Sequence, residues 1–308
     1  MHDIIIIGSG PAGLTAALYA RRAEKSVLLI EKAAFGGQMT HSPKIENYPG
    51  YSEISGSELA DKLLTQVMEQ GADIELDAVL AIEGESGSFK VVCESGTHEA
   101  KSVIIAAGSK HRTLGLEGEE LYTGEGISYC AVCDGAFYKG KTVAIIGGGN
   151  SALVEAGMLA DGCEKVFIIQ NLDYLTGEKN LATRLYARDN VEIMLSTVVD
   201  SIIAENNVFR GIKLKNQKTG ETAELLIDGM FVAIGQKPEN EPFASVLKIN
   251  DYGYIAAGED CKPEGAKDGI FVAGDCRTKA IRQITTATAD GAVAALAACR
   301  FIDELRTI

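Results

Sequence analysis

The sequence predicts an α/β protein built on a repeated parallel βαβ unit. An apolar run, a glycine-rich turn and the start of a helix occur at residues 3–13 (DIIIIGSGPAG) and again at residues 142–152 (TVAIIGGGNSA). Each is followed by a helical pattern and a second apolar run, an alternation typical of βαβ units in a parallel sheet. We therefore expect two Rossmann-like nucleotide-binding domains in one chain.

The order of the elements predicts that the first domain is discontinuous. After the second repeat the chain returns to an apolar strand at residues 269–276 (GIFVAGDC) and then to a long Ala/Thr-rich helix. These elements would complete the first sheet. We expect residues 1–113 and 241–308 to form an FAD-binding type of domain, and residues 114–240 to form an inserted NAD(P)-binding-like domain that carries the CxxC motif described below.

Composition narrows the class of protein. The chain has 308 residues and a formal net charge of −14, so nucleic-acid phosphate and anionic lipid would repel it. No apolar run approaches the ~20 residues that span a bilayer. The N-terminus enters an apolar strand at once and shows no basic segment followed by a cleavage site. We therefore expect a cytoplasmic protein that binds neither nucleic acid nor membrane.

The first glycine turn predicts a dinucleotide site. Gly8, Gly10 and Gly13 form a GxGxxG pattern, which allows a tight turn, lets the backbone approach a pyrophosphate and lets the helix pack on the strand. The pyrophosphate would lie at the helix N-terminus, where free N–H groups favour it. Glu31 follows the first glycine by 31 − 8 = 23 residues, near the ~20 expected of a carboxylate on ribose hydroxyls.

The stretch YCAVCDG (129–135) predicts a redox-active cysteine pair. Cys130 and Cys133 can close a small disulfide, and a CxxC setting commonly lowers the pKa of one thiol into the catalytic range. Asp134 is either a proton donor and acceptor for a thiolate or an ordinary residue of an Asp-Gly turn. The alternative of half a zinc site would need two more ligands, and the four histidines and other cysteines offer no second pair.

Nine short motifs occur in the order of a known family. They are GSGPAG, FGGQ, IENYPG, IIAAG, CAVCDG, GGGNSA, FVAIGQKP, FVAGD and IRQITTA, and they span essentially the whole chain. In this set the chain resembles the low-molecular-weight, bacterial-type thioredoxin reductases. The resemblance implies FAD as cofactor, thioredoxin as substrate and a homodimer whose smaller domain rotates between flavin reduction and disulfide exchange.

The resemblance also implies roles for individual residues. Cys133 would be the thiol next to the flavin, Cys130 the thiol that exchanges with thioredoxin, and Asp134 the acid. The residues expected to bind FAD, with Asp275 at the ribityl chain or pyrophosphate and the last three along the flavin, are Ser9, Gly10, Pro11, Ala12, Gly13, Glu31, Gly36, Gly37, Gln38, Asn47, Ala107, Gly108, Gly274, Asp275, Arg282, Gln283 and Ile284.

The second glycine turn departs from the family pattern. NADPH-dependent members end the following strand in His-Arg-Arg and carry another arginine soon after, whereas this chain has Gln170, Asn171 and Leu172, then Thr176. The bidentate, charge-assisted contacts to a ribose phosphate are thereby lost. Gln170 follows its first glycine by 170 − 147 = 23 residues, the offset of Glu31, so an amide stands where a carboxylate would bind NADH.

Without a nicotinamide, a one-electron protein donor is the natural source of electrons, because a flavin accepts electrons singly. The chain in this respect resembles the ferredoxin-dependent flavin thioredoxin reductases, which keep the fold, FAD and the CxxC but lack the NADPH-binding residues. We therefore expect ferredoxin as electron donor. Three alternatives stay open: an NAD(P)H-dependent thioredoxin reductase with an atypical nucleotide site, an FAD-dependent dithiol oxidase that uses oxygen, and a non-enzymatic FAD-bound redox sensor.

Ferredoxins are acidic, so a chain this acidic must offer a local basic patch to receive one. Two clusters are candidates for this patch, although each side chain could equally be part of a solvated face. They are Arg21, Arg22 and Lys25, and Lys110 with Arg112.

Overall fold

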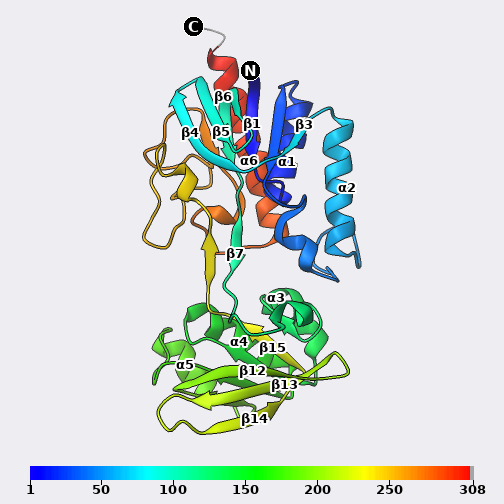
Figure 1. Ribbon diagram of the computed structural model, residues 1–308, viewed down its shortest axis with the longest axis vertical. Coiled ribbons are helices and arrows are strands. Elements are labelled where there is room, and N and C mark those ends of the chain that lie inside the picture. The colour runs from blue at the N-terminus through cyan, green and yellow to red at the C-terminus, as the bar shows by residue number, and fades with distance from the viewer. Residues whose placement is uncertain (306–308) are drawn as a thin grey trace. The chain divides into compact units, whose positions relative to one another are not determined.

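The computed structural model describes residues 1–305, which divide into two compact units (Figure 1). Unit 1 contains Met1–Lys110 and the chain from Lys237 onward, and unit 2 contains His111–Gln236. The two connections between the units run through β7 (Ser109–His111) and β16 (Gln236–Pro238), which pair with each other as a two-stranded sheet. The division therefore falls a few residues before each boundary expected from the sequence.

Unit 1 is built on a seven-stranded sheet of order β3-β2-β1-β6-β5-β4, with β17 paired to β6. The pairs among β1, β2, β3, β6 and β17 are parallel, whereas β4, β5 and β6 pair antiparallel. The strands are β1 (His2–Ile7), β2 (Val27–Glu31), β3 (Asp73–Leu76), β4 (Val79–Glu85), β5 (Ser88–Cys93), β6 (Thr97–Ile105) and β17 (Ile270–Val272).

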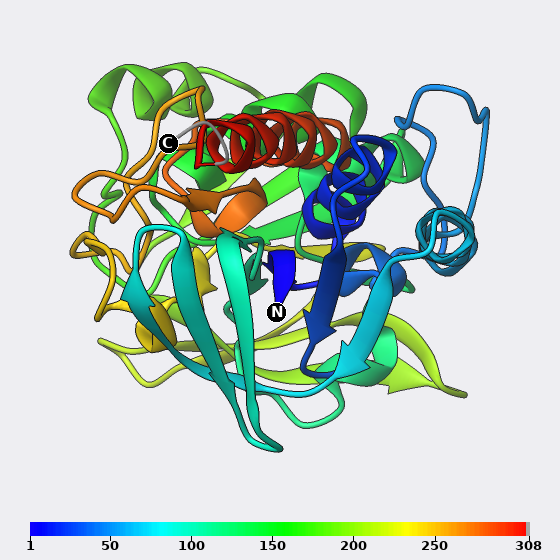
Figure 2. The same cartoon turned by 90° about the horizontal axis from the view of Figure 1, so that it is seen from above.

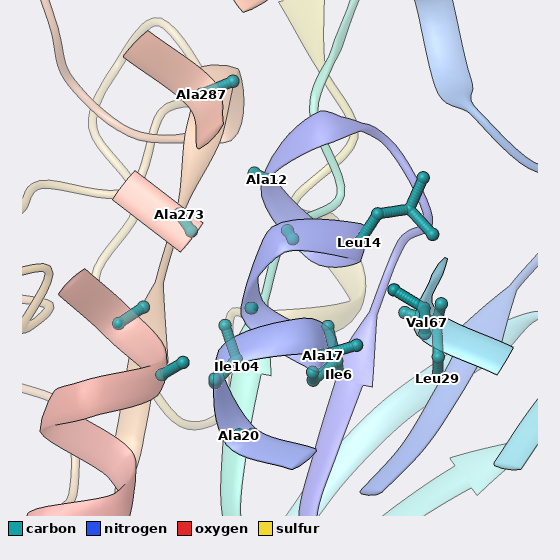
Figure 3. Close-up of a cluster of buried hydrophobic side chains, with 14 of the residues drawn as sticks. Ile6, Ala12, Leu14, Ala17, Ala20, Leu29, Val67, Ile104, Ala273 and Ala287 are labelled. Carbon is teal, nitrogen blue, oxygen red and sulfur yellow. The ribbon is translucent and has the colours of Figure 1, made fainter. Parts of the chain in front are cut away.

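The apolar run of β1 is explained by burial on both faces of this sheet. Ile4 and Ile6 face a core formed with the helices, and Ile5 and Ile7 face a second core formed with β4, β5 and residues 243–255. A strand that is covered on both sides needs apolar residues at every position rather than at alternate ones. Figure 3 shows the first of these cores, where Ile6, Leu29 and Leu14 lie close together.

Helices α1 (Pro11–Arg22) and α6 (Ile284–Leu305) lie side by side on the sheet of unit 1, and α2 (Gly56–Glu69) packs against α1 (Figure 2). Small residues bring α1 and α6 close together, because a Cβ added at Gly291 would lie only 2.1 Å from the carbonyl oxygen of Ala12. Ser55 caps the N-terminus of α2 by accepting a hydrogen bond from the amide of Glu58 at 3.1 Å. The helices are α1 (Pro11–Arg22), α2 (Gly56–Glu69) and α6 (Ile284–Leu305), with short 3₁₀ turns η1 (Gly37–His41), η4 (Glu241–Phe243) and η5 (Gly274–Cys276).

Unit 2 repeats the parallel sheet, in the order β11-β10-β9-β15-β8, and adds an antiparallel sheet of order β12-β13-β14. Helices α4 and α5 cover one face, while Phe209, Ile212 and Leu214 of β13 cover the other. The strands are β8 (Ile127–Ser128), β9 (Thr142–Ile146), β10 (Lys165–Ile169), β11 (Val191–Met194), β12 (Thr197–Glu205), β13 (Val208–Asn216), β14 (Thr222–Leu226) and β15 (Gly229–Val232). The helices are η2 (Glu119–Tyr122), α3 (Ala131–Asp134), η3 (Gly135–Tyr138), α4 (Asn150–Gly162) and α5 (Lys179–Tyr186).

The predicted fold class, two parallel-sheet Rossmann-like domains, is confirmed. The sequence analysis was incomplete because it anticipated only parallel strands. It missed β4 and β5 and the whole sheet β12-β13-β14, whose half-buried strands show the alternating pattern of antiparallel sheets. Within residues 1–305, no helix combines the length and apolar character that crossing a membrane requires.

We predict that Gly291→Ala lowers the free energy of unfolding by about 1–3 kcal/mol, because the added methyl group overpacks the contact of α6 with α1. Gly157→Ala is the matched control, since a Cβ at Gly157 in α4 meets nothing within 4 Å. Removing that helical glycine should stabilise the protein by about 0.5–1 kcal/mol. Urea unfolding of both variants checks this, and equal effects in the two would contradict the close approach.

Candidate active site

The first glycine turn has the geometry that a bound pyrophosphate requires. Gly8 adopts φ +100°, and a Cβ at Gly13 would lie 1.8 Å from the Gly8 carbonyl oxygen, so α1 packs directly on the turn. Gly10 is the N-cap of α1, and no side chain caps this helix end. The first amides of α1 are therefore left for a ligand, which is how Rossmann folds bind phosphate groups.

Glu31 ends β2 beside this turn, with its carboxylate held in a fixed orientation. Its Oε2 accepts hydrogen bonds from the amide of Ser9 at 2.8 Å and from the Ser9 hydroxyl at 2.7 Å. Its Oε1 accepts from the amide of Ala33 at 3.1 Å. Each carboxylate oxygen has two lone-pair sites, so the group can still accept from ribose hydroxyls.

Segments far apart in the sequence bring further predicted FAD residues together. The amide of Gly36 donates to the Ser9 carbonyl at 3.1 Å, and a Cβ at Gly37 would lie 3.1 Å from the Cα of Gly10. Asn47 Nδ2 donates to Gln283 Oε1 at 3.2 Å. The remaining predicted residues flank these groups: Pro11, Ala12 and Gly13 in the first turn of α1, exposed Gln38 in η1, half-buried Ala107 and Gly108 after β6, and Ile284 at the start of α6.

Two buried polar atoms, one in η5 and one between η5 and α6, have no hydrogen-bond partner among the described residues. Asp275 Oδ1 in η5 and Arg282 Nε accept or donate no hydrogen bond among the described residues. Burial raises the pKa of Asp275, and the guanidinium of Arg282 stacks over the ring of Tyr254 at 4.5 Å. Buried polar atoms are nearly always paired in native proteins. These two atoms therefore fit a polar ligand such as the ribityl chain or pyrophosphate of FAD.

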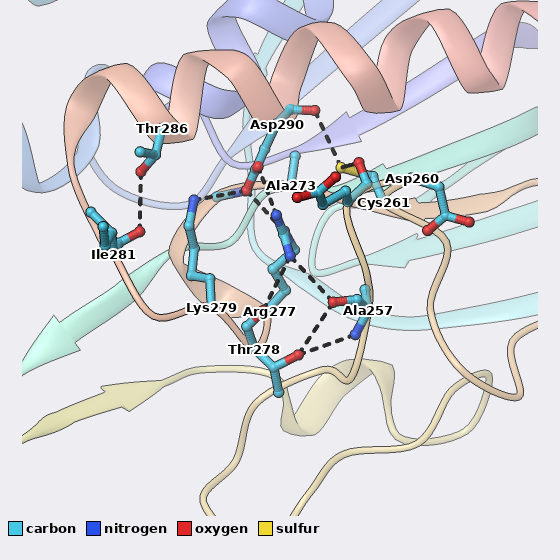
Figure 4. A network of polar contacts seen from close by, with 12 residues as sticks. Ala257, Asp260, Cys261, Ala273, Arg277, Thr278, Lys279, Ile281, Thr286 and Asp290 are labelled. Carbon is cyan, nitrogen blue, oxygen red and sulfur yellow. Dashed lines mark hydrogen bonds and ion pairs between the residues drawn. The ribbon is translucent and has the colours of Figure 1, made fainter.

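A buried ion cluster fixes the turn that carries Asp275 (Figure 4). Asp290 of α6 accepts two hydrogen bonds from the Arg277 guanidinium, at 2.9 and 2.8 Å, and one from Lys279 Nζ at 2.9 Å. Its Oδ2 also accepts from the amide of Gly274 at 3.0 Å. Although burial opposes ionisation, the hydrogen bonds from Arg277 and Lys279 lower the pKa of Asp290.

The sequence analysis did not identify this cluster. The signal was present, since an acidic residue interrupts an Ala-rich helix and two basic residues follow the AGD motif within a few positions. Arg277 and Lys279 lie before α6 and Asp290 lies within it, so the spacing of these residues in the sequence did not reveal that they are in contact.

The CxxC motif forms a disulfide between Cys130 and Cys133 at the start of α3. The amide of Cys133 donates to Cys130 Sγ at 3.2 Å, so a backbone N–H is already directed at the sulfur that would carry a thiolate. Both cysteines are half-buried. The five other cysteines of the described residues are free thiols, and all are buried.

Asp134 lies beside the disulfide and is held by a neighbouring hydroxyl. Ser128 Oγ donates to Asp134 Oδ2 at 2.6 Å and accepts from the amide of Cys130 at 3.1 Å. Burial raises the pKa of Asp134, and the hydrogen bond from Ser128 only partly opposes this shift. The carboxyl group can thus hold a proton closer to neutral pH than an exposed aspartate would. Ser128 was not identified from the sequence.

Gln170, which stands where a carboxylate would bind the ribose of NADH, directs its side chain into the loop that follows β10. Gln170 is 5% exposed, and its Nε2 donates to the carbonyl oxygen of Tyr174 at 3.2 Å. The side chain packs on the turn itself, because a Cβ at Gly148 would lie 2.6 Å from Gln170 Cδ. The amide of Gly177 donates to the Gly148 carbonyl at 2.8 Å. The loop after β10 is therefore tied down over the glycine turn.

Known proteins resemble this chain over its whole length. The family model described as pyridine nucleotide-disulphide oxidoreductase matches residues 2–291. The thioredoxin reductase of Bacillus subtilis (strain 168) is 40% identical over 308 residues, covering 99% of this chain and 96% of that protein. A "34.2 kDa protein in rubredoxin operon" of Clostridium pasteurianum is 40% identical over 301 residues, covering 97% of each. The crystal structure of thioredoxin reductase from Streptococcus pyogenes MGAS5005 covers 99% of both chains at 40% identity, with a TM-score of 0.94.

The chain therefore belongs to the pyridine nucleotide-disulphide oxidoreductases, in the branch of the low-molecular-weight thioredoxin reductases. It is a flavoprotein disulfide reductase, and its cofactor is FAD.

We predict that Asp290→Asn lowers the free energy of unfolding by about 3–5 kcal/mol at pH 7, because Arg277 and Lys279 stay buried without their counterion. The pKa of Asp290 is lowered in the folded protein. Its contribution is therefore present above the unfolded pKa and is lost as the pH falls through the folded one. Urea unfolding at pH 7 and at pH 3 should show a smaller difference from the wild type at pH 3. A pH-independent difference would contradict the ionic role.

Proposed function

We propose that this disulfide reductase reduces thioredoxin in the cytoplasm. Relatives that match the chain over nearly its full length are named thioredoxin reductases, and their name states this substrate. The disulfide of Cys130 and Cys133 supplies the exchanging pair. Thiol–disulfide exchange proceeds through a mixed disulfide formed by attack of a thiolate. Five buried free thiols fit a reducing compartment.

The roles proposed for the site residues are those that the family resemblance implies, and the contacts of several of these residues support them. FAD, when bound, supplies the electron pair that opens the disulfide. Glu31 and the Gly8–Gly13 turn hold its ribose and pyrophosphate, and Asp275 and Arg282 supply the unpartnered buried polar atoms. Cys133 receives the electrons, Cys130 exchanges with thioredoxin, and Asp134 holds the proton that the leaving thiolate of thioredoxin takes up.

We also propose that the active form is a homodimer. Val293 and Leu296 are exposed apolar side chains three residues apart, which places them on one face of α6. A second copy of the chain would remove this face from water.

We propose further that electrons come from reduced ferredoxin rather than NADPH. The observation that carries this proposal is the closure of Gln170 onto the carbonyl of Tyr174, which uses its amide donor inside the loop. The three positions that carry arginine in NADPH-dependent members, Asn171, Leu172 and Thr176, are exposed and uncharged here. A 2′-phosphate would meet no fixed cation at these positions.

Charges around this loop also disfavour a phosphate. Asp173 lies within it and forms an ion pair with Lys218 at 3.0 Å, and Glu178 follows the loop. Lys179 and Arg184, the nearest cations after the loop in sequence, are exposed on α5. Solvated lysine and arginine side chains give a weaker and less specific phosphate contact than a bidentate arginine pair.

One relative points to a protein electron carrier. The Clostridium pasteurianum protein is named for its place in a rubredoxin operon, which associates it with a small redox protein.

The structure corrects the expected docking clusters for an acidic carrier. Lys25 is buried and forms an ion pair with Asp303, while Arg21 donates to the carbonyl oxygens of Gln70 and Lys25. Lys110 forms an ion pair with Glu239 at 3.3 Å. Of the five residues considered, only Arg22 and Arg112 are both exposed and outside the ion pairs found among the described residues.

One anaerobic experiment tests the donor. The oxidised enzyme is mixed with thioredoxin and with NADPH, NADH or chemically reduced ferredoxin, and bleaching of the flavin band is followed. We expect rapid bleaching with reduced ferredoxin alone. Rapid bleaching by NADPH would overturn the proposal, and oxygen-dependent turnover of a small dithiol without a ferredoxin response would favour a dithiol oxidase. Cys133→Ser should stop thioredoxin reduction and leave FAD bound.

A gain of function tests the nucleotide loop. The triple variant Asn171→Arg, Leu172→Arg and Thr176→Arg restores the arginine positions, and we expect at least tenfold tighter NADPH binding, about 1.4 kcal/mol, from charge-assisted contacts. Thr183→Arg, on the exposed side of α5, is the control for added charge. Titration calorimetry measures both. An unchanged triple variant would show that loop charge does not decide nucleotide binding.

A further inference from the structure

A second carboxyl group, besides that of Asp134, contacts the redox motif. The amide of Ala131, the residue after Cys130, donates to Glu155 Oε2 at 3.3 Å. Glu155 belongs to α4, the helix that packs against α3 and η3, and its side chain is half-buried. It is neither a residue of the glycine turn nor a member of the apolar core of α4. No function described above uses it.

The surroundings of Glu155 leave its charge uncompensated. No lysine or arginine of the described residues forms an ion pair with it, and the amide of Ala131 is its one observed hydrogen-bond donor. Burial raises the pKa of Glu155, and the hydrogen bond from Ala131 only partly opposes this shift. The same holds for Asp134, with Ser128 as its donor. Two carboxyl groups that bind protons more readily than exposed acids thus flank one disulfide.

We propose that Glu155 is a second proton-holding residue of the disulfide centre, which accepts from Ala131 while the disulfide is closed and binds a proton when the disulfide is reduced. An electron pair breaks the Sγ–Sγ bond and leaves two sulfur anions. Two protons taken up from solvent balance this charge, and they are shared by Cys130, Cys133, Asp134 and Glu155. New negative charge at Cys130 favours protonation of a carboxyl group beside it.

The two protons bound on reduction of the disulfide also balance the reduction of thioredoxin. This part of the inference rests on the proposed function. The Cys130 thiolate attacks the thioredoxin disulfide, and the first thioredoxin thiolate leaves and takes a proton. The Cys133 thiolate then attacks Cys130 Sγ, which reforms the enzyme disulfide and releases the second thioredoxin thiolate, which takes the other proton. Asp134 supplies one of these protons, and Glu155, the other carboxyl group that contacts the motif, supplies the second.

Other ionisable groups near the motif are few. On η3, Tyr138 has a pKa raised by burial and by the charges of Asp134 and Asp228. On β10, Lys165 forms an ion pair with Glu192 at 2.6 Å, and the charged residues of α5, Lys179 and Arg184, are exposed. None of these groups contacts the backbone of the CxxC segment through a hydrogen bond observed among the described residues.

The test measures the coupling of Glu155 to Cys130 without any donor or thioredoxin. In a Cys133→Ser background Cys130 is the accessible thiol, because the five other cysteines of the described residues are buried. Its alkylation by iodoacetamide is followed against pH. Glu155→Gln keeps an acceptor oxygen for Ala131 but loses the charge, so we expect the pKa of Cys130 to fall by about one unit. Glu164→Gln, an exposed acid just beyond α4, should leave that pKa unchanged.

A second measurement follows reoxidation of the dithionite-reduced, otherwise native enzyme by thioredoxin in a stopped-flow instrument. Glu155→Gln should slow the reaction about tenfold at pH 8 and little at pH 6, where protons from solvent replace those of the lost carboxyl group. An unshifted alkylation pKa, an equal shift in Glu164→Gln, or a loss of rate independent of pH would each overturn the proposal. An enzyme that does not react with thioredoxin would instead refute the proposed substrate, since the alkylation result does not depend on it. An unchanged flavin spectrum and circular dichroism confirm the fold of each variant.

Discussion

Unit 1 depends on two close contacts, that of α1 with the glycine turn after β1 and that of α6 with α1. At Gly13 and Gly291 any side chain would collide with the backbone of Gly8 and Ala12. This close packing brings the free amides of α1 to the glycine turn and brings Asp290 of α6 within hydrogen-bond distance of Gly274. The packing of the core and the placement of Asp290 beside Gly274 are thus consequences of the same contacts.

The two units differ at the position that follows the first glycine of each turn by 23 residues. In unit 1, Glu31 is held by hydrogen bonds from Ser9 and keeps acceptor capacity for a ribose. In unit 2, Gln170 stands at the same offset but donates to Tyr174 of its own loop. The Glu31 carboxylate keeps its acceptor capacity, whereas the Gln170 amide uses one of its donors inside its own loop.

Much of this architecture could be predicted from the sequence because its signals are local. The apolar runs of β1 and β9, their glycine turns and the helix α6 can each be recognised from one continuous segment of the sequence. Contacts that join distant segments were not predictable in the same way. Lys25 was considered part of a basic docking cluster because nothing near it in sequence shows its ion pair with Asp303. The acid in α6 and the bases after the AGD motif could be seen in the sequence, but their spacing does not show that Asp290 pairs with Arg277.

The same limit applied at the disulfide. Cys130, Cys133 and Asp134 are adjacent in sequence, so the motif identified them, whereas Glu155 reaches the motif only because α4 packs against α3. A half-buried acid on a helix that follows a glycine turn has no distinctive sequence pattern. Its relation to the cysteines exists only in three dimensions.

The burial of the remaining cysteines determines how the reduced protein meets electrophiles. Burial raises the pKa of Cys93 and Cys261 to about 11 and that of Cys276 to about 12, so these sulfurs stay protonated under physiological conditions. A thiol rather than a thiolate is a poor nucleophile. An alkylating inhibitor that reaches the reduced protein therefore reacts at Cys130 or Cys133, because these are the cysteines of the described residues that are not buried.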